Sequence, residues 1–280
     1  MPPSAKWIDQ IVRLQQPDGS WGCLHSLSRP TKECPITTEQ ALRRLWVLGL
    51  TGEDAPIQRA LAYMRGVLAH RIAPPDRREK GLNWDFFEQM ILATWIRRFL
   101  PRDEQAQAIA ALWAGILQSA FAGGTLDPQA YEAAYRQRIP RLHAQERLIG
   151  IPQFYMVTLL WEMLDRDTEC AFVDYLIHHP GGIYYIYNDR VAEVPPRFDS
   201  PRAGSYITAL ECLSGYRCAP EKLRFAVDWL LSHQREGGWD LGASAKDGIY
   251  FPTSDSWRTA ALRQKDCTER ITRLLRAIVG

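Results

Sequence analysis

Three carboxylates stand where the sequence predicts the first turns of separate helices, and their types suit acid–base chemistry. Glu39, Asp85 and Asp255 each follow a loop and precede an apolar helical run. If these loops gather at one end of the fold, the three side chains converge. Neighbouring carboxylates raise one another's pKa, and an apolar setting raises it further, which suits a general acid. The alternative is that each acid only complements the dipole of its own helix.

Two of these acids also define a second hypothesis. Glycan hydrolysis needs two carboxylates that face each other across a groove. Asp85 and Asp255 are the pair whose placement would test that reaction.

Aromatic residues and one arginine follow the same predicted turns and are candidates for lining a cavity. An aromatic face attracts a cation by roughly 1–2 kcal/mol, although large aromatic side chains also fill cores. A loop holding Tyr184, Tyr185 and Tyr187 favours contact with a ligand. The predicted substrate-binding residues are Trp84, Tyr155, Tyr185, Tyr206, Tyr250, Trp257 and Arg258.

The sequence predicts no metal site and no cofactor. Cys23-Leu-His25, with Cys34 nearby, has side chains that suit zinc, but no fourth ligand is evident. His178 and His179 end a predicted helix, where imidazole can cap carbonyl groups.

One loop carries enough positive charge to hold an anion. Arg77-Arg78-Glu79-Lys80 precedes a predicted helix start, so a diphosphate could bind to the loop and to the helix N-terminus. A solvated loop of mixed charge is the alternative.

The elements that would position these residues are predicted to be helices. Apolar residues recur at helical spacing between turns rich in Gly and Pro, and the run 183–187 is the one strand-like segment. We expect helices over 5–16, 38–49, 55–70, 83–95, 103–121, 128–138, 152–164, 167–178, 201–213, 220–234, 254–263 and 268–279. Runs 86–95 and 154–161 are apolar nearly all round, which predicts inner helices, whereas 103–113 reads as an outer one.

Two turns repeat each other near the ends of the chain. Gln16-Pro-Asp-Gly-Ser-Trp21 and Gln234-Arg-Glu-Gly-Gly-Trp239 share the pattern Gln, any residue, acid, Gly, small residue, Trp. Similar turns recur about every 55 residues, near positions 20, 75, 124, 182 and 238. Such periodicity is typical of helical-hairpin repeats.

The paired turns resemble the QW motif of the terpenoid cyclase and protein prenyltransferase superfamily. The resemblance implies one α/α-toroid domain over 1–280, made of about five to six helical hairpin repeats around an apolar cavity. The catalytic motifs of that superfamily do not match. Asp-x-Asp-Asp and Asp-Asp-x-x-Asp are absent, the nearest string being Asp165-Arg-Asp167-Thr168, and no Asp, Cys and His set resembles the zinc ligands.

Composition and hydropathy argue against some classes of partner and location. A net charge of +2 over 280 residues gives no case for a nucleic-acid partner. No segment is long enough to span a membrane, residues 1–7 do not resemble a signal peptide, and we expect a cytoplasmic protein with reduced cysteines. The sequence makes no prediction of the oligomeric state.

We therefore expect an apolar, isoprenoid-like small molecule in a central aromatic-lined cavity. The protein would then be an unorthodox cyclase or transferase, or a binding protein. The alternative is a non-catalytic module that binds a protein or peptide.

Overall fold

The structure, a computed structural model, describes residues 5–280. The signal-peptide prediction concerns residues 1–7, and the first four of these residues lie outside the described range. Within 5–280 there are twelve α-helices and one 3₁₀ helix, and the β-type pairs are isolated bridges, so the all-α prediction is confirmed. None of these helices is long and apolar enough to cross a membrane. The helices are α1 (Ala5–Val12), α2 (Thr38–Val47), α3 (Ala55–Leu68), α4 (Trp84–Phe99), α5 (Glu104–Ala120), α6 (Pro128–Arg138), α7 (Phe154–Leu159), α8 (Arg166–His178), α9 (Pro201–Leu213), α10 (Ala219–Lys222), α11 (Arg224–Ser232), η1 (Ala243–Ala245) and α12 (Ala260–Val279).

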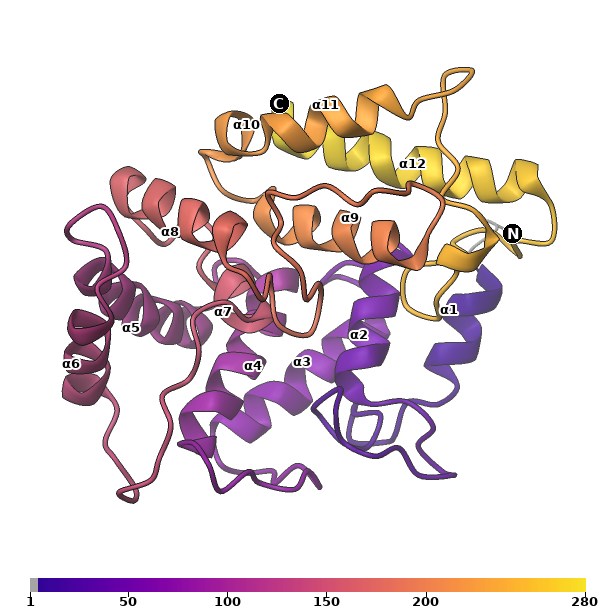
Figure 1. Ribbon diagram of the computed structural model, residues 1–280. Helices are drawn as coiled ribbons and strands as arrows, with labels where there is room; N and C mark the ends of the chain where they lie inside the picture. Colours follow the sequence, from indigo (N-terminus) through magenta and orange to yellow (C-terminus); the bar gives the residue numbers. More distant parts are fainter. Residues whose placement is uncertain (1–4) are drawn as a thin grey trace.

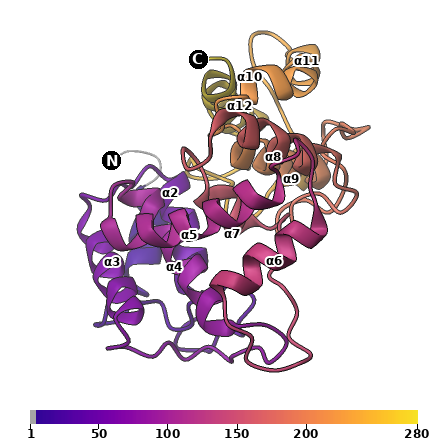
Figure 2. The same cartoon turned by 90° about the vertical axis from the view of Figure 1, so that its left-hand side faces the viewer.

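Four helices, α2, α4, α7 and α9, form the interior. Every residue of α7 is buried, and α4 buries side chains all round its circumference. α4 packs against α3, α5 and α7, and α7 continues the contact to α9. Helices α5, α6 and α8 lie on one side of this interior, and α11 and α12 lie on another (Figures 1 and 2). The inner and outer character predicted for α4, α7 and α5 agrees with this burial. The number of hairpin repeats, and a toroid made from them, stay predictions.

The two tryptophan turns make the same contacts. Trp21 donates from its indole to the Ile11 carbonyl (2.8 Å) and from its backbone to the Thr38 hydroxyl (2.9 Å). Trp239 donates in the same way to the Leu230 carbonyl (2.7 Å) and the Thr268 hydroxyl (3.0 Å). Each turn therefore ties the end of one helix to a helix later in the chain.

The C-terminal prediction needs a correction. Residues 254–263 and 268–279 are not two helices, because a single helix, α12, spans Ala260–Val279. Asp266 on that helix accepts hydrogen bonds from the backbone of Thr253 and Ser254 and from the indole of Trp257. The segment before α12 is folded back onto its side by these bonds, so Ser254 cannot begin a helix. Helix α7 is also shorter than predicted.

Candidate functional site

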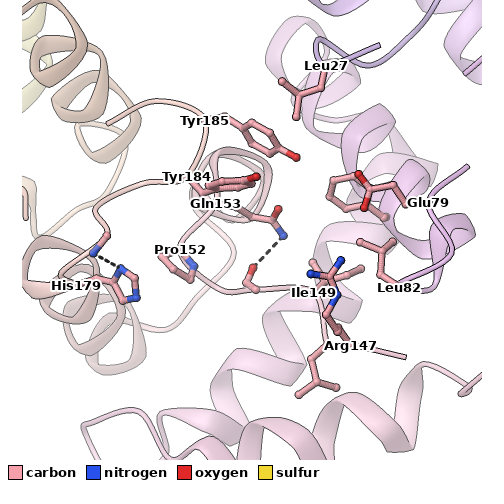
Figure 3. A pocket seen from close by; sticks show the side chains of 14 residues that line it. Leu27, Glu79, Leu82, Arg147, Ile149, Pro152, Gln153, His179, Tyr184 and Tyr185 are labelled. Carbon is pink, nitrogen blue, oxygen red and sulfur yellow. Dashed lines mark hydrogen bonds between the residues drawn. The ribbon is translucent and has the colours of Figure 1, made fainter. Parts of the chain in front are cut away.

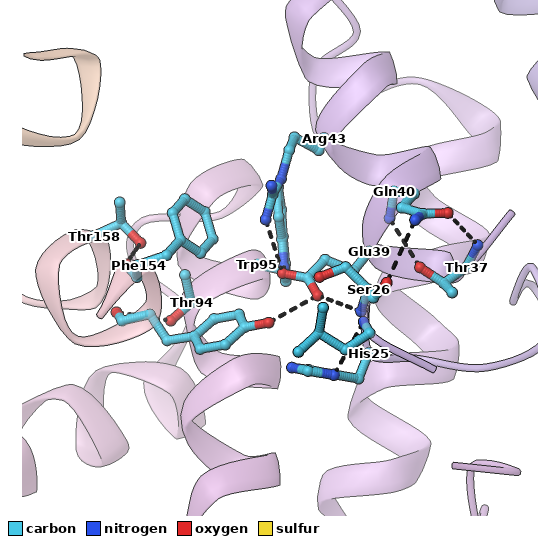
Figure 4. A network of polar contacts seen from close by, with 12 residues as sticks. His25, Ser26, Thr37, Glu39, Gln40, Arg43, Thr94, Trp95, Phe154 and Thr158 are labelled. Atoms are coloured by element: carbon cyan, nitrogen blue, oxygen red, sulfur yellow. Dashed lines mark hydrogen bonds and ion pairs between the residues drawn. The ribbon is translucent and has the colours of Figure 1, made fainter. Parts of the chain in front are cut away.

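Glu39 is a buried ion rather than a general acid. Its carboxylate is fully buried and accepts hydrogen bonds from the Ser26 backbone (2.8 Å), the Tyr155 hydroxyl (2.8 Å) and the Trp95 indole (3.2 Å) (Figure 4). It also pairs with Arg43 at 3.2 Å. Burial acts to raise the pKa of Glu39, but Arg43 and the hydrogen bonds outweigh burial and hold that pKa below its ordinary value. Glu39 therefore holds no proton to donate near neutral pH.

The other two predicted acids lie elsewhere, on the surface. Asp85 forms an ion pair with Arg78, and Asp255 forms one with Lys6 at 3.3 Å. Their side chains are 51% and 69% exposed, and no hydrogen bond joins either to Glu39. The three carboxylates thus share no site in the described residues. The carboxyl whose pKa is raised, chiefly by burial, is Glu88, which accepts the Trp84 indole N–H at 3.1 Å.

Three predicted aromatic residues do come together, around His25. The centroid of the His25 ring lies 6.4 Å from Trp84, 6.0 Å from Tyr155 and 5.6 Å from Tyr185. Phe87, one turn along α4 from Trp84, completes this aromatic cage at 5.9 Å. The sequence nominated these three aromatic residues but not His25 or Phe87, because the members of the cage come from four separate segments.

The backbone around His25 is fixed from two sides. Asp76 accepts hydrogen bonds from the backbone N–H groups of Leu24 (2.6 Å) and His25 (2.8 Å). The start of α2 pairs with the same loop, since the N–H of Glu39 donates to the Leu24 carbonyl at 3.0 Å. His25 itself is 96% buried, its residual exposure being 4%. Hydrogen bonds on two sides therefore hold His25 and the cage in place within the fold.

The remaining predicted binding residues lie outside the cage. Tyr206 is buried and donates to the Val191 carbonyl at 3.0 Å. Tyr250 lies under the guanidinium of Arg270, 4.3 Å from its ring centroid. Trp257 is buried against Asp266, and Arg258 is exposed on the preceding loop.

The junction of the inner helices is nearly filled. Side chains from α2, α4, α7 and α9 meet Tyr250 there and leave a space of only about 20 Å³. Arg43 occupies the junction, with its guanidinium 4.6 Å from the Phe154 ring centroid and 5.9 Å from that of Trp95. A central cavity, as implied by the family resemblance, is therefore absent at this point.

The larger cavities lie at the loop end, where α4 and α7 begin. The tyrosine cleft has a volume of about 460 Å³ (Figure 3). Its apolar lining includes Leu27, Leu82, Phe87, Ile149, Pro152 and Tyr185. Burial raises the pKa of the Tyr185 hydroxyl, so this phenol stays neutral near pH 7. The cleft thus offers an apolar chain a partly enclosed surface.

A second cavity, the basic pocket, adjoins the cleft. It measures about 810 Å³, and Leu27 and Glu79 line both spaces. Its other lining residues include His25, Trp84, Arg29, Arg77, Arg78 and Lys80. The loop predicted to attract an anion therefore faces a cavity.

The zinc alternative gains no support. Cys23 and His25 line the basic pocket, but residues 5–280 contain no group of three or more His, Cys, Asp or Glu that could hold a metal ion. His178 contacts the Asp174 carbonyl at 2.9 Å, in agreement with the predicted capping role.

No protein-family model, curated protein or solved structure matches this chain.

Proposed function

We propose that this protein binds an apolar small molecule, isoprenoid or similar, in the tyrosine cleft. The observation that carries the proposal is the cleft itself. Its volume of about 460 Å³ falls in the usual range of small-molecule sites, roughly 300–1,000 Å³. Its walls are mostly aliphatic and aromatic, and Glu79, Arg147, Gln153 and His179 supply polar groups. This site lies at the loop end of the inner helices rather than at their junction.

The architecture we propose is an α/α toroid whose centre is filled by side chains. Its support is the pair of matching tryptophan turns and the succession of buried helices from α2 to α9. The two largest cavities lie at the loop end, which favours that end as the place for a ligand.

The proposal is a binding function, and catalysis as a cyclase or transferase stays a prediction. Acid catalysis by Glu39 has no support, because its proton is lost well below neutral pH. Asp85 and Asp255 are solvated and paired with different cations.

Binding of a neutral apolar dye such as Nile red, followed by fluorescence, tests the site. Leu27, 60% exposed at the rim of the cleft, has a matched control in Leu231, 49% exposed on α11. Leu27→Asn is expected to weaken dye binding several-fold, and Leu231→Asn is expected to leave it unchanged. Equal effects of the two substitutions would show that the dye binds elsewhere. Mass spectrometry of lipid extracted from the purified protein then identifies the natural ligand.

One observation favours a protein or peptide partner as the second candidate. Tyr184 is 55% exposed beside Leu27 at the same rim, so an apolar surface faces solvent. A protein that competes with Nile red for the cleft, together with no extractable lipid, would favour this alternative.

A further inference from the structure

His25 carries a buried hydrogen-bond donor without a partner. The N–H of Leu27 donates to Nδ1 at 3.2 Å, so Nδ1 is the acceptor and Nε2 carries a proton. Nε2 has no partner among the described residues. Buried polar groups are nearly always paired, so an unpaired one at a cavity points to a missing acceptor. Since His25 lines the basic pocket, a ligand bound there is the candidate acceptor.

The basic pocket favours an acceptor with negative charge. Arg29, Arg77 and Lys80 form no ion pair within residues 5–280, and Arg78 is paired with Asp85. Two further carboxylates, Asp76 and Glu79, lie on or beside the pocket. The pocket lining itself holds these four cations against one carboxylate, Glu79, so it favours an anionic head group.

The two cavities are arranged for an elongated molecule. They adjoin at Leu27 and Glu79, and the cage around His25 borders both, with Trp84 lining the basic pocket and Phe87 and Tyr185 lining the cleft. A chain in the cleft can therefore place its end near His25.

We infer that the ligand is a long-chain carboxylate, whose head group accepts a hydrogen bond from His25 Nε2 in the basic pocket while its hydrocarbon chain lies in the tyrosine cleft. This inference rests on the proposed function. It adds the negatively charged carboxylate head group to that proposal.

Calorimetric titration with three twelve-carbon probes separates the two proposals. Dodecanoate is expected to bind at least about tenfold more tightly than dodecan-1-ol, because a hydrogen bond to a charged acceptor is stronger than one to a neutral acceptor. If both probes bind equally, the head-group inference is overturned and the cleft proposal stands. If neither binds, both fail. If dodecyl phosphate, a dianion, binds more tightly than dodecanoate, the assignment of the head group as a carboxylate is wrong.

Substitutions of His25 test the donor. His25→Asn keeps an oxygen acceptor at the position of Nδ1 and removes the donor, so the preference for dodecanoate over the alcohol should disappear. His25→Gln places an amide N–H near the position of Nε2 and should restore the preference. If His25→Asn keeps it, the inference is overturned.

A second pair of variants does not depend on the buried cage. Arg77→Gln with Lys80→Gln changes two exposed side chains of the basic pocket and should lower dodecanoate affinity about tenfold without changing that of the alcohol. Arg102→Gln, at an exposed arginine outside the pocket, is the control and should have no effect. An unchanged affinity of the double variant for dodecanoate would contradict the inference.

Discussion

The hydroxyl of Tyr155 donates a hydrogen bond to the buried carboxylate of Glu39 across 2.8 Å, although 116 residues separate them. This bond joins the start of α7 to the start of α2, and the Trp95 indole adds α4 to the same carboxylate. Burial and the nearby negative charge of Glu39 raise the pKa of Tyr155 well above its ordinary value, so the phenol stays a donor. One ionised side chain therefore organises three of the inner helices.

Removal of this charge should destabilise the fold strongly. Glu39→Gln leaves the buried Arg43 without a counter-ion, which typically costs about 3–5 kcal/mol. Urea denaturation measures the loss. Asp9→Asn is the matched control, since the Asp9–Arg13 pair is exposed, and its effect should stay within about 0.5 kcal/mol. A similar small change in both variants would mean that Glu39 does not organise the interior.

The same carboxylate should make stability depend on acid pH. The pKa of Glu39 is lower in the folded state than the unfolded value of about 4.3. Its contribution is therefore fully present above the unfolded pKa and is lost as pH falls through the folded pKa. The difference in unfolding free energy between wild type and Glu39→Gln should be constant from pH 7 to about pH 5 and then shrink. A constant difference down to pH 3 would contradict the lowered pKa.

The helical class could be predicted from the sequence because it depends on local periodicity. The paired turns could also be predicted from the sequence, because each has a glycine two residues before its tryptophan. Gly19 and Gly237 both adopt positive φ, a conformation that favours glycine. The start of α12 could not be predicted from the sequence. Asp266 accepts a hydrogen bond from the backbone of Ser254 and holds that segment against the side of the helix, and a contact across 12 residues leaves no local sequence pattern.

The candidate site was less predictable, and two acids show why. Glu39 and Asp85 are both the second residue of a helix, α2 and α4. Glu39 is covered by the loop that carries His25, whereas Asp85 faces solvent. The two acids have the same position in their helices, so the difference in their burial comes from the surrounding tertiary structure alone. Sequence spacing could nominate both acids but could not distinguish them.

The matching turns should respond alike to matching substitutions. Trp21→Phe and Trp239→Phe each remove an indole donor to a helix-end carbonyl and keep most of the buried ring. Each should cost about 1–3 kcal/mol, because the carbonyl loses its partner and the smaller ring packs less well. Thr38→Val and Thr268→Val should each cost about 1 kcal/mol through the backbone bond. Thermal unfolding compares the four variants. If a substitution at one turn left the stability unchanged while the matching substitution at the other turn lowered it strongly, the two turns would not have equivalent roles.

The loop that carries Tyr184 and Tyr185 should depend on Gly182. Its φ is +59°, and an added Cβ would lie 2.2 Å from the Tyr187 carbonyl oxygen and 2.3 Å from that of Asp189. Gly182→Ala must therefore move the backbone of the tyrosine loop.

Gly124 is the matched control, with φ of +78° and no atom within 4 Å of an added Cβ. Gly124→Ala should cost only the strain of the left-handed conformation, about 1–2 kcal/mol, and leave Nile red binding unchanged. Gly182→Ala should cost more and also weaken dye binding several-fold, because Tyr185 forms part of the cleft wall. Chemical denaturation and dye titration on the same samples separate the two effects. Unchanged dye affinity in folded Gly182→Ala would show that the tyrosine loop does not shape the site.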